Sequence, residues 1–241
     1  MNILITGASN GVGRALALAC ARSGRFSKIV LNGGHDEQAL LETARLVTAA
    51  APDSLRCLAS LGDVGDFAYV DSLRRQYGPV DVLVNNAAVS WTGLLTDMTP
   101  AEWDALLRTN LTSLYNTCHA YAPDMVSAQR GVILNVSSVW GLVGASCEVA
   151  YSASKGGVNA FTRALAKELA PSHIQVNAAA LGAVDTEMNR HLTAEEKSAL
   201  ADEIPAGRLA SPEEIASGLL KLLEMPEYCS GEIIRMDGCW L

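Results

Sequence analysis

Tyr151 and Lys155 are the two side chains in this sequence whose types and spacing best suit proton transfer. They begin a segment with helical periodicity, and residues four apart lie on the same face of a helix. A free tyrosine has a pKa of about 10, and a nearby cation favours its phenolate and lowers that pKa. We therefore expect Lys155 to lower the pKa of Tyr151, so that the hydroxyl exchanges protons near neutral pH.

Ser138 and Asn110 are the polar residues that would complete such a site. Ser138 ends a predicted strand, where its hydroxyl would orient a substrate carbonyl at the carboxyl edge of a sheet. Asn110 would hold a water that connects Lys155 with solvent. Taken singly, each of the four residues also has a purely structural explanation, as a half-buried tyrosine, a surface lysine, a serine at a strand end and an asparagine in a helix. Together they favour a catalytic set.

A glycine-rich segment, TGASNGVG at residues 6–13, lies between the first predicted strand and the first predicted helix. Glycines there let the backbone approach a pyrophosphate, and the following helix offers unpaired N–H groups to the phosphates. A tight turn that only brings helix and strand together is the alternative. The position favours a dinucleotide, with contacts expected from Gly7, Ser9, Asn10, Gly11, Val12 and Gly13.

The end of the second predicted strand decides between the two nicotinamide dinucleotides, because an acid there selects NAD and an arginine tolerates NADP. The sequence has Asn32 and Gly33 at this place, so no acid repels a 2′-phosphate. Arg14 and His35 are the only cations nearby. This pattern favours NADP(H), and NAD(H) remains possible. After the third strand, Asp63 and Val64 would contact the adenine, although Asp63 also suits a helix cap.

Short β-branched runs alternate with longer amphipathic stretches along the chain, which is typical of parallel strands joined by helical crossovers. We predict strands at residues 2–6, 28–32, 55–59, 80–85, 131–137, 174–178 and 232–236, and helices at residues 12–23, 37–50, 64–77 and 151–170. No linker or repeat divides the chain. The fold class is therefore α/β, a doubly wound parallel sheet in one domain over residues 1–241, with the polar stretch 186–212 as a substrate lid or as an ordinary pair of surface helices.

The composition excludes several kinds of partner. The 241 residues carry a formal charge of −8, which disfavours nucleic acid and anionic membranes, and no apolar stretch is long enough to span a bilayer. The six cysteines and four histidines are scattered, without the spacing of a metal site. We expect a protein of the cytoplasm that binds no metal.

These motifs resemble the short-chain dehydrogenase/reductase family. The resemblance runs from residue 2 to residue 241 and rests on the glycine segment, NNAA at 85–88, Asn110, Ser138, YSASK at 151–155 and the Asp185–Thr186 region. It implies a Rossmann-like seven-stranded sheet of order 3-2-1-4-5-6-7, hydride transfer to a carbonyl carbon and a homotetramer or dimer. It also implies cofactor contacts from Asn86, Ala87, Tyr151, Lys155, Gly182, Val184 and Thr186.

Two narrower resemblances point to different substrates. Residues 204–209 and 230–232 look like those of bacterial 3-oxoacyl-[acyl-carrier-protein] reductases, which reduce a ketone to a secondary alcohol. Residues 137–155 look like those of elongation factor P 5-aminopentanone reductases, which act on a ketone attached to a lysine of that protein. A rival from another class is an NAD(P)-binding sensor without turnover, but such proteins should lose catalytic residues that this chain keeps.

Three residues are candidates for recognising the substrate. The carboxylate of Glu148 would pair with the amine of an aminopentanone group, or it would cap the helix that follows. Trp91 and Trp140 would wall the same pocket, although buried tryptophans are more often core residues. The apolar run 239–241 suggests burial against a neighbouring subunit.

Overall fold

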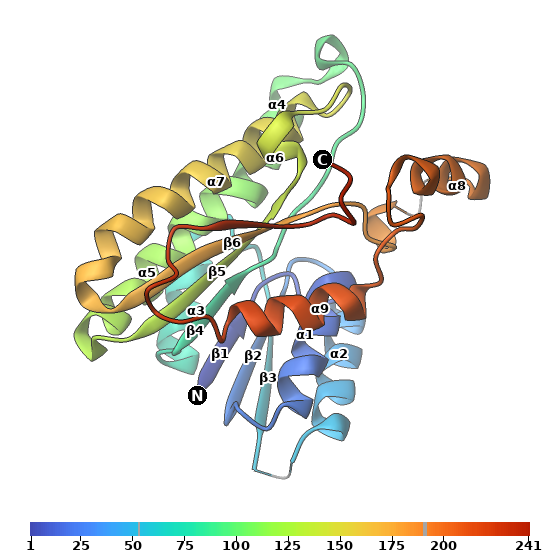
Figure 1. The fold of residues 1–241 in the computed structure, drawn as a ribbon. Helices are drawn as coiled ribbons and strands as arrows, with labels where there is room; N and C mark the ends of the chain where they lie inside the picture. Colours follow the sequence, from blue (N-terminus) through green and yellow to red (C-terminus); the bar gives the residue numbers. More distant parts are fainter. Residues whose placement is uncertain (53, 190–191) are drawn as a thin grey trace.

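The computed structural model describes residues 1–52, 54–189 and 192–241. Within these ranges the chain forms one seven-stranded sheet whose paired strands are all parallel, in the order β3-β2-β1-β4-β5-β6-β7 (Figure 1). The strands are β1 (Asn2–Ile5), β2 (Lys28–Gly33), β3 (Arg56–Leu61), β4 (Val82–Asn85), β5 (Gly131–Ser138), β6 (Ile174–Leu181) and β7 (Ile233–Met236). The α/β doubly wound fold and its strand order are confirmed.

The central strands are apolar along their whole length because helices cover both faces of the sheet. In β1, Ile3 and Ile5 pack in one core cluster, whereas Leu4 between them packs in the other. All three are completely buried. This alternation divides the interior into two cores, one on each face.

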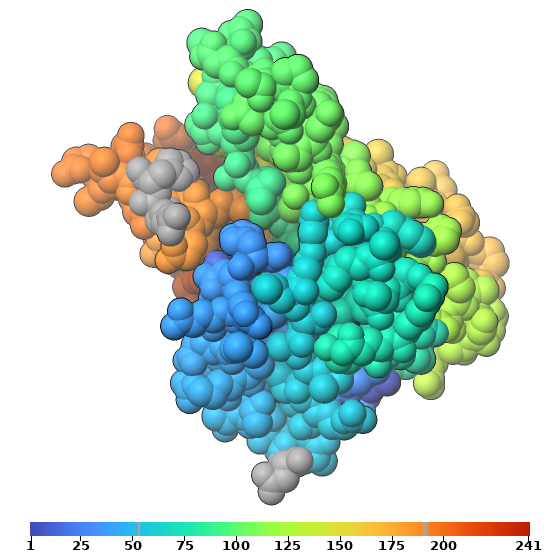
Figure 2. Space-filling model, turned by 180° about the vertical axis from the view of Figure 1, so that it is seen from behind, coloured from blue at the N-terminus to red at the C-terminus, as the bar shows by residue number. Residues whose placement is uncertain are grey.

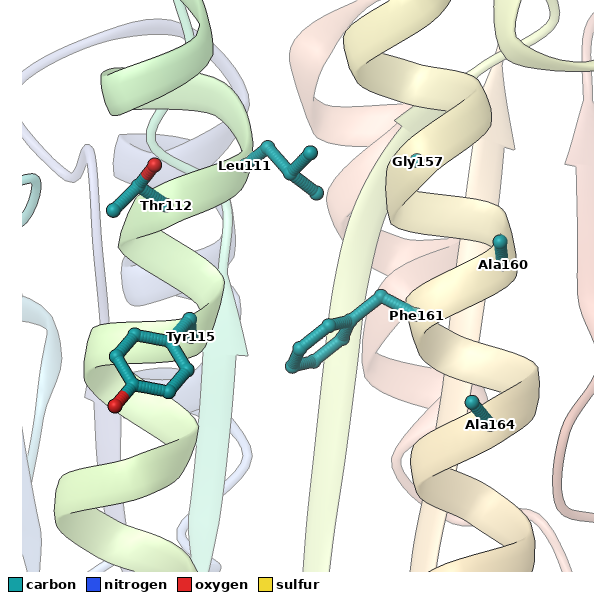
Figure 3. A pocket seen from close by; sticks show the side chains of 7 residues that line it. All are labelled: Leu111, Thr112, Tyr115, Gly157, Ala160, Phe161 and Ala164. Atoms are coloured by element: carbon teal, nitrogen blue, oxygen red, sulfur yellow. The ribbon is translucent and has the colours of Figure 1, made fainter.

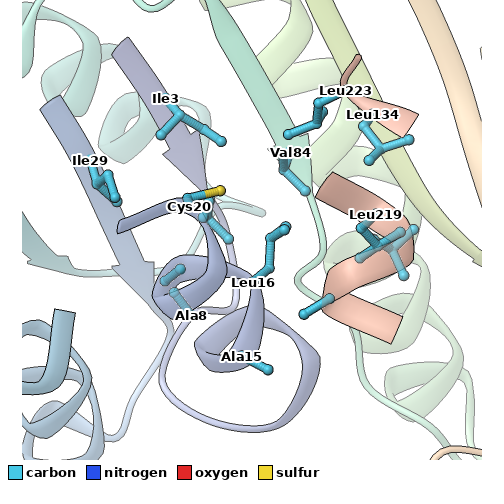
Figure 4. Close-up of a cluster of buried hydrophobic side chains, with 14 of the residues drawn as sticks. Ile3, Ala8, Ala15, Leu16, Cys20, Ile29, Val84, Leu134, Leu219 and Leu223 are labelled. Carbon is cyan, nitrogen blue, oxygen red and sulfur yellow. The ribbon is translucent and has the colours of Figure 1, made fainter. Parts of the chain in front are cut away.

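The first core lies beneath α1 (Gly11–Arg22), α2 (Glu37–Ala50) and α9 (Pro212–Leu222). Figure 4 shows Leu16 and Cys20 of α1 meeting Leu219 of α9 over Val84 of the sheet. The two ends of the sequence are therefore joined in one core, although roughly two hundred residues separate them, as expected for a single domain of this size.

The second core lies beneath α3 (Phe67–Tyr77), α5 (Ser113–Ala128) and α7 (Val149–Leu169). Tyr121 and Met125 of α5 are almost completely buried there. The first two turns of α7 carry Tyr151 and Lys155. Packing of α7 against β5 and β6 thus fixes the position of both side chains.

Shorter elements follow the carboxyl ends of the strands. They are η1 (Leu95–Asp97), α4 (Pro100–Leu107), the π-helical turn η2 (Arg108–Thr112), α6 (Trp140–Val143), η4 (Glu187–Asn189) and α8 (Ala194–Glu203), whereas η3 (Ala170–Ser172) ends α7. From behind, Figure 2 shows the green residues around α4 and the orange residues around α8 projecting beyond the blue amino-terminal part at one end of the molecule.

Element boundaries differ from the predictions at two places that matter for the site. The helix α3 begins at Phe67, not at residue 64, because the Asp66 carboxylate accepts a hydrogen bond from the Ala68 N–H at 2.9 Å and caps the helix. The strand β6 continues to Leu181, because that residue pairs with Ser138 of β5 and Met236 of β7.

The predicted lid contains α8, none of whose residues is buried. Its far end is tied to the body of the protein, because Ile204 is buried and the Ala206 N–H donates to the Gly238 carbonyl at 3.1 Å. Residues 190 and 191 of this stretch lie outside the described residues. A lid function stays a prediction.

The described part of the chain contains neither a membrane-spanning helix nor a cluster of metal-binding side chains. None of its helices is long and apolar enough to cross a bilayer. Over the same residues, no group of three or more histidine, cysteine or acidic side chains is placed to hold a metal ion.

Candidate active site

The side chains of Ser138, Tyr151 and Lys155 come together where the end of β5 meets the first two turns of α7. Ser138 and Tyr151 are joined by a side-chain hydrogen bond. The Lys155 Nζ lies 5.6 Å from the centre of the Tyr151 ring. The geometry therefore unites three of the four residues that the sequence selected for catalysis.

Lys155 is 2% exposed, which is unusual for an ammonium group. Its Nζ donates a hydrogen bond to the Val136 carbonyl at 2.9 Å. Burial lowers the pKa of Lys155 to about 8, because water no longer stabilises the charged form. Gly141 of α6 packs directly on the Lys155 backbone, where an added Cβ would lie 2.6 Å from its carbonyl carbon.

The pKa of Tyr151 is raised to about 12, mainly because burial disfavours the phenolate. The Ser138 hydrogen bond lowers this pKa and the charge of Glu148 raises it further. The expectation that Lys155 lowers the pKa of Tyr151 is wrong for this arrangement, since burial raises that pKa and the ammonium is turned toward the Val136 carbonyl. The Tyr151 hydroxyl is protonated at neutral pH and suited to give a proton.

Asn110, the fourth predicted residue, is buried in the π-helical turn η2. Its side chain makes two hydrogen bonds of 2.8 Å with the backbone of Val89 and donates to Ser154 Oγ at 3.1 Å. Ser154 Oγ in turn donates to the Tyr151 carbonyl at 2.7 Å. Asn110 thus joins the segment after β4 to α7, and the water that it would hold stays a prediction.

The glycine loop is closely packed, as expected for a phosphate-binding turn. Gly7 and Gly11 have φ of 63° and 52°, a region that favours glycine. A Cβ added at Gly7 would lie 2.7 Å from the Ala87 Cα. A Cβ added at Gly13 would lie 2.2 Å from the Gly7 carbonyl oxygen. These glycines are therefore required by close backbone approach.

Asn86 and Thr6 hold this loop against the end of β4. Asn86 Nδ2 donates to the carbonyls of Thr6 at 2.9 Å and Gly7 at 3.0 Å. Thr6 Oγ1 accepts hydrogen bonds from the N–H groups of Asn86 and Ala87, both at 3.0 Å. The Asn86 side chain supports the loop, and the predicted contacts of Asn86 and Ala87 with a cofactor stay predictions.

Ser9 shows how a dinucleotide would fit. Its Oγ is buried and has no hydrogen-bond partner in the described structure. The hydroxyl lies against Gly33, since a Cβ added to this glycine would be 2.3 Å from Ser9 Oγ. At the start of α1, the Asn10 side chain makes no capping hydrogen bond. A partnerless hydroxyl beside an uncapped helix end fits the phosphate-bearing ribose of NADP.

Asn32 and Asp63, two residues predicted to contact the adenosine part of the cofactor, form hydrogen bonds within the protein. Asn32 Nδ2 donates to the Gly62 carbonyl at 2.9 Å and to the Tyr69 hydroxyl at 3.0 Å, which ties the ends of β2 and β3 together. The Asp63 carboxylate accepts from the Gly65 N–H at 2.7 Å and forms an ion pair with Arg108 at 2.8 Å. Asp63 does not cap α3. Val64, beside it, is buried.

Arg14 lies beside the glycine loop. Its guanidinium donates to Thr43 Oγ1 at 2.8 Å and to the carbonyls of Ser9 and Ala39 at 2.5 and 3.2 Å. Arg14 therefore clamps the glycine loop to α2, and because these acceptors are neutral, attraction of a 2′-phosphate by its charge stays a prediction. His35 is exposed.

The segment after β6 reaches the glycine loop. Gly182 continues the sheet, since its N–H donates to the Met236 carbonyl at 2.9 Å. Val184 pairs with Ala210, and a Cβ at Gly11 would lie 3.3 Å from the methyl group of Thr186. The stretch 182–186 therefore borders the space between the loop and the Tyr151 site.

Glu148 and Trp91 lie on loops that meet beside Tyr151. Glu148 is half-buried and its side chain does not cap α7, so that interpretation is wrong. The Gly93 N–H donates to the Cys147 carbonyl at 2.8 Å, which brings the loop of Trp91 to Glu148. The Trp91 Nε1 donates to Glu102 at 3.2 Å, and the pocket roles of Trp91 and Glu148 stay predictions.

The sequence did not predict a contact of Trp240 within its own chain. The Trp240 ring packs on Trp140, with ring centres 4.8 Å apart, and burial of the run 239–241 against a neighbouring subunit stays a prediction. Gly238 and Cys239 before it both have positive φ, 67° and 65°. A glycine preceding the tryptophan was the available signal of a turn.

Comparison with known proteins agrees with this geometry. Residues 1–197 match the model of the family described as short chain dehydrogenase. The uncharacterized oxidoreductase YmfI of Bacillus subtilis is 39% identical over 239 residues, covering 98% of this chain and 97% of that protein. The 3-oxoacyl-[acyl-carrier-protein] reductase FabG of Chlamydia trachomatis is 34% identical over 236 residues, covering 98% and 95%.

A solved structure is similar over nearly the whole chain. It is a candidate 2-deoxy-D-gluconate 3-dehydrogenase from Agrobacterium tumefaciens with bound NADP, 29% identical, with a TM-score of 0.88, and the match covers 99% of this chain and 95% of the other. Together with the glycine loop and the Ser138–Tyr151–Lys155 group, these matches show that the chain belongs to the short-chain dehydrogenase family and is an NAD(P)-dependent oxidoreductase.

Proposed function

We propose that this protein reduces a ketone to a secondary alcohol with NADPH, and that the ketone is a 3-oxoacyl group on an acyl carrier protein. The observation that carries this proposal is the Tyr151 hydroxyl, which is hydrogen-bonded to Ser138 and has a pKa raised to about 12. A protonated phenol beside a second hydroxyl suits an acid that completes a reduction.

The chain's own groups have separate tasks in this reaction. When bound, the nicotinamide supplies a hydride to the carbonyl carbon. Ser138 donates a hydrogen bond to the carbonyl oxygen and holds it near Tyr151. Tyr151 gives its proton to that oxygen, and the Lys155 ammonium stabilises the phenolate that remains. Asn110, through a water, would return a proton from solvent.

Two observations support NADPH as the cofactor. Gly33 leaves no carboxylate at the end of β2 to repel a 2′-phosphate. Ser9 Oγ, without a partner above Gly33, is available to donate to that phosphate. The similar structure from Agrobacterium tumefaciens binds NADP.

The acyl-carrier assignment is supported by relatives named 3-oxoacyl-[acyl-carrier-protein] reductase, such as those of Chlamydia trachomatis and Thermotoga maritima, each 34% identical to this chain. The test is a comparison of kcat/KM for 3-oxoacyl thioesters with NADPH and with NADH. We expect turnover with a preference for NADPH. Turnover only with NADH would overturn the cofactor assignment, and no turnover of any thioester would overturn the substrate assignment.

Glu148 favours a second candidate, reduction of an aminopentanone group on elongation factor P. Its charge raises the pKa of Tyr151, so the carboxylate acts at the reaction site. A carboxylate there would pair with the amine of such a substrate. For this substrate Glu148→Gln should raise KM roughly tenfold. An unchanged KM would remove this candidate, and Glu168→Gln, an exposed glutamate at the far end of α7, is the matched control.

We propose that the protein forms a homotetramer or a dimer through α5 and α7. Figure 3 shows the groove between these helices, where Leu111 and Tyr115 face Gly157 and Phe161. The groove has a volume of about 560 Å³ and is almost entirely apolar, and Tyr115 is 53% exposed. A second copy with the same face would cover it. A monomer by light scattering would contradict this assignment.

A cytoplasmic location is part of the same proposal. All six cysteines are free thiols in the structure. Burial raises the pKa of Cys20 and of Cys118 to about 12, which keeps these two thiols protonated and unreactive. Such thiols suit a reducing compartment.

A further inference from the structure

Residues 237–241 form a tight turn, called the Asp237 turn here. The Asp237 side chain is only 7% exposed and accepts hydrogen bonds from the N–H groups of Cys239 at 3.1 Å and Leu241 at 3.2 Å. Cys239 has a φ of 65°, a conformation that residues other than glycine seldom adopt. The turn is thus built from a buried carboxylate and an unfavourable backbone conformation.

The turn is fixed from two sides. Asp237 lies against Gly182, where an added Cβ would be 2.8 Å from Asp237 Cα, so it borders the stretch that approaches the glycine loop. Gly238 packs on Ile204 and Ala206 at the base of the predicted lid, and its carbonyl accepts the Ala206 N–H at 3.1 Å. The position of the turn is therefore coupled to both segments that surround the reaction site.

Trp240 is carried by this turn to the other side of the site. Its ring meets the Trp140 ring edge to face, with centres 4.8 Å and planes 62° apart. The backbone N–H of Trp140 donates a hydrogen bond to Ser138 Oγ at 3.2 Å. Figure 1 shows the end of the chain beside α6, the helix that begins at Trp140. Both rings are only partly buried.

We infer that Trp240 determines substrate specificity, by forming with Trp140 an apolar wall on which an unbranched aliphatic chain attached to the ketone lies. This inference rests on the proposed ketone reduction. The backbone of Trp140 is joined to Ser138, the residue proposed to hold the carbonyl, so the ring pair begins two residues from it and a chain that leaves the carbonyl can reach the rings. The strained backbone at Cys239 positions the Trp240 ring, and such strain is typical of binding sites.

The test is the dependence of kcat/KM on chain length in acetoacetyl, 3-oxohexanoyl and 3-oxooctanoyl thioesters of N-acetylcysteamine. Each methylene buried on the wall should raise kcat/KM of the wild type about fourfold. In Trp240→Ala this rise should largely disappear, and in Trp240→Phe it should be intermediate. Tyr228→Ala, which removes a fully exposed aromatic ring outside the site, is the matched control and should keep the wild-type rise.

A second variant separates the turn from the ring. Cys239→Val keeps Trp240 but places a β-branched residue at positive φ, so it should also flatten the rise, whereas Cys239→Gly should retain it. A wild-type rise that persists in Trp240→Ala would overturn the inference. If the wild type reduces none of these thioesters, the acyl-carrier proposal fails. The inference about Trp240 is then decided by binding of the same series, measured by tryptophan fluorescence: an affinity that rises with chain length in the wild type and not in Trp240→Ala supports it, and an affinity independent of chain length overturns it.

Discussion

The two sides of the active site are built differently. The cofactor side consists of the glycine loop, the ends of β1, β2 and β4 and the start of α1, and it is closed by buried glycines and backbone contacts. The side that we propose for the substrate consists of α6, α8 and the Asp237 turn, where α8 buries no residue and the two tryptophan rings are partly exposed. Cys147 and Cys239 on this side have positive φ.

The difference explains which part of the function the chain defines most tightly. On the cofactor side, a Cβ added at Gly7, Gly13 or Gly33 would meet a neighbouring atom within 3 Å. The backbone that would bind a dinucleotide therefore has little freedom to move. On the substrate side, loop residues and exposed rings set the shape of the site, and single substitutions can alter it without disturbing the core. On the function proposed above, cofactor binding and substrate choice would therefore depend on separate parts of the molecule.

Gly13→Ala should produce the largest effect and tests the tight packing of the cofactor side. The new methyl group would lie 2.2 Å from the Gly7 carbonyl oxygen, so the loop must open. We expect a loss of about 3 kcal/mol or more in the free energy of unfolding and much weaker NADPH binding. Gly34→Ala, with no atom within 4 Å, is the control for urea unfolding, and equal losses in both variants would contradict the comparison.

Lys155→Met tests the cost of the buried ammonium between the two sides. The lysine pKa is about 8 in the folded protein and 10.5 when unfolded, so between these pH values the unfolded chain binds the extra proton. The free energy of unfolding of the wild type should therefore rise by about 3 kcal/mol relative to Lys155→Met from pH 8 to 10.5. The check is urea unfolding at several pH values, and parallel pH curves would contradict the lowered pKa.

Ser9→Ala separates cofactor recognition from stability. Because Ser9 Oγ has no partner in the described structure, its removal should change the free energy of unfolding by less than about 0.5 kcal/mol. The affinity for NADPH should fall roughly tenfold, since a hydrogen bond to a charged phosphate is lost. Titration with NADPH and NADH gives the readout, and an equal loss for both cofactors would argue against a contact with the 2′-phosphate.

Cys239→Gly should have the smallest effect and sharpens the description of the substrate side. Glycine adopts a φ of 65° without steric cost, so thermal unfolding should show a gain of up to about 1 kcal/mol. Cys229→Gly, at a residue without positive φ, should instead lower the stability slightly. A loss of stability in Cys239→Gly would show that the turn is not strained.

The fold was predictable because its signals are local. Runs such as Ile3 to Ile5 are apolar on both faces, which requires a parallel sheet covered on both sides, and the glycine loop marks the first strand and helix. The extension of β6 to Leu181 was not predictable, since it depends on pairing with two other strands. Sequence gives residue types and spacing, whereas strand ends depend on neighbours far along the chain.

The site shows the same limit. Ser138, Tyr151 and Lys155 were identified from spacing, and the structure unites them. The direction of a long side chain is not local information, so the hydrogen bonds by which Arg14 clamps the glycine loop were not predictable. The contact of Trp240 with Trp140 joins residues about a hundred positions apart, and only the packed chain reveals it.

The most direct test of the central claim is steady-state reduction of a 3-oxoacyl thioester by NADPH, with the wild type and Tyr151→Phe measured beside NADPH binding. The proton donor should be essential, so kcat/KM should fall roughly a hundredfold to ten-thousandfold in the variant, far more than its affinity for NADPH. Wild-type turnover in Tyr151→Phe would contradict the role of this hydroxyl. A wild type that binds NADPH and reduces no ketone would indicate an NADP-binding sensor.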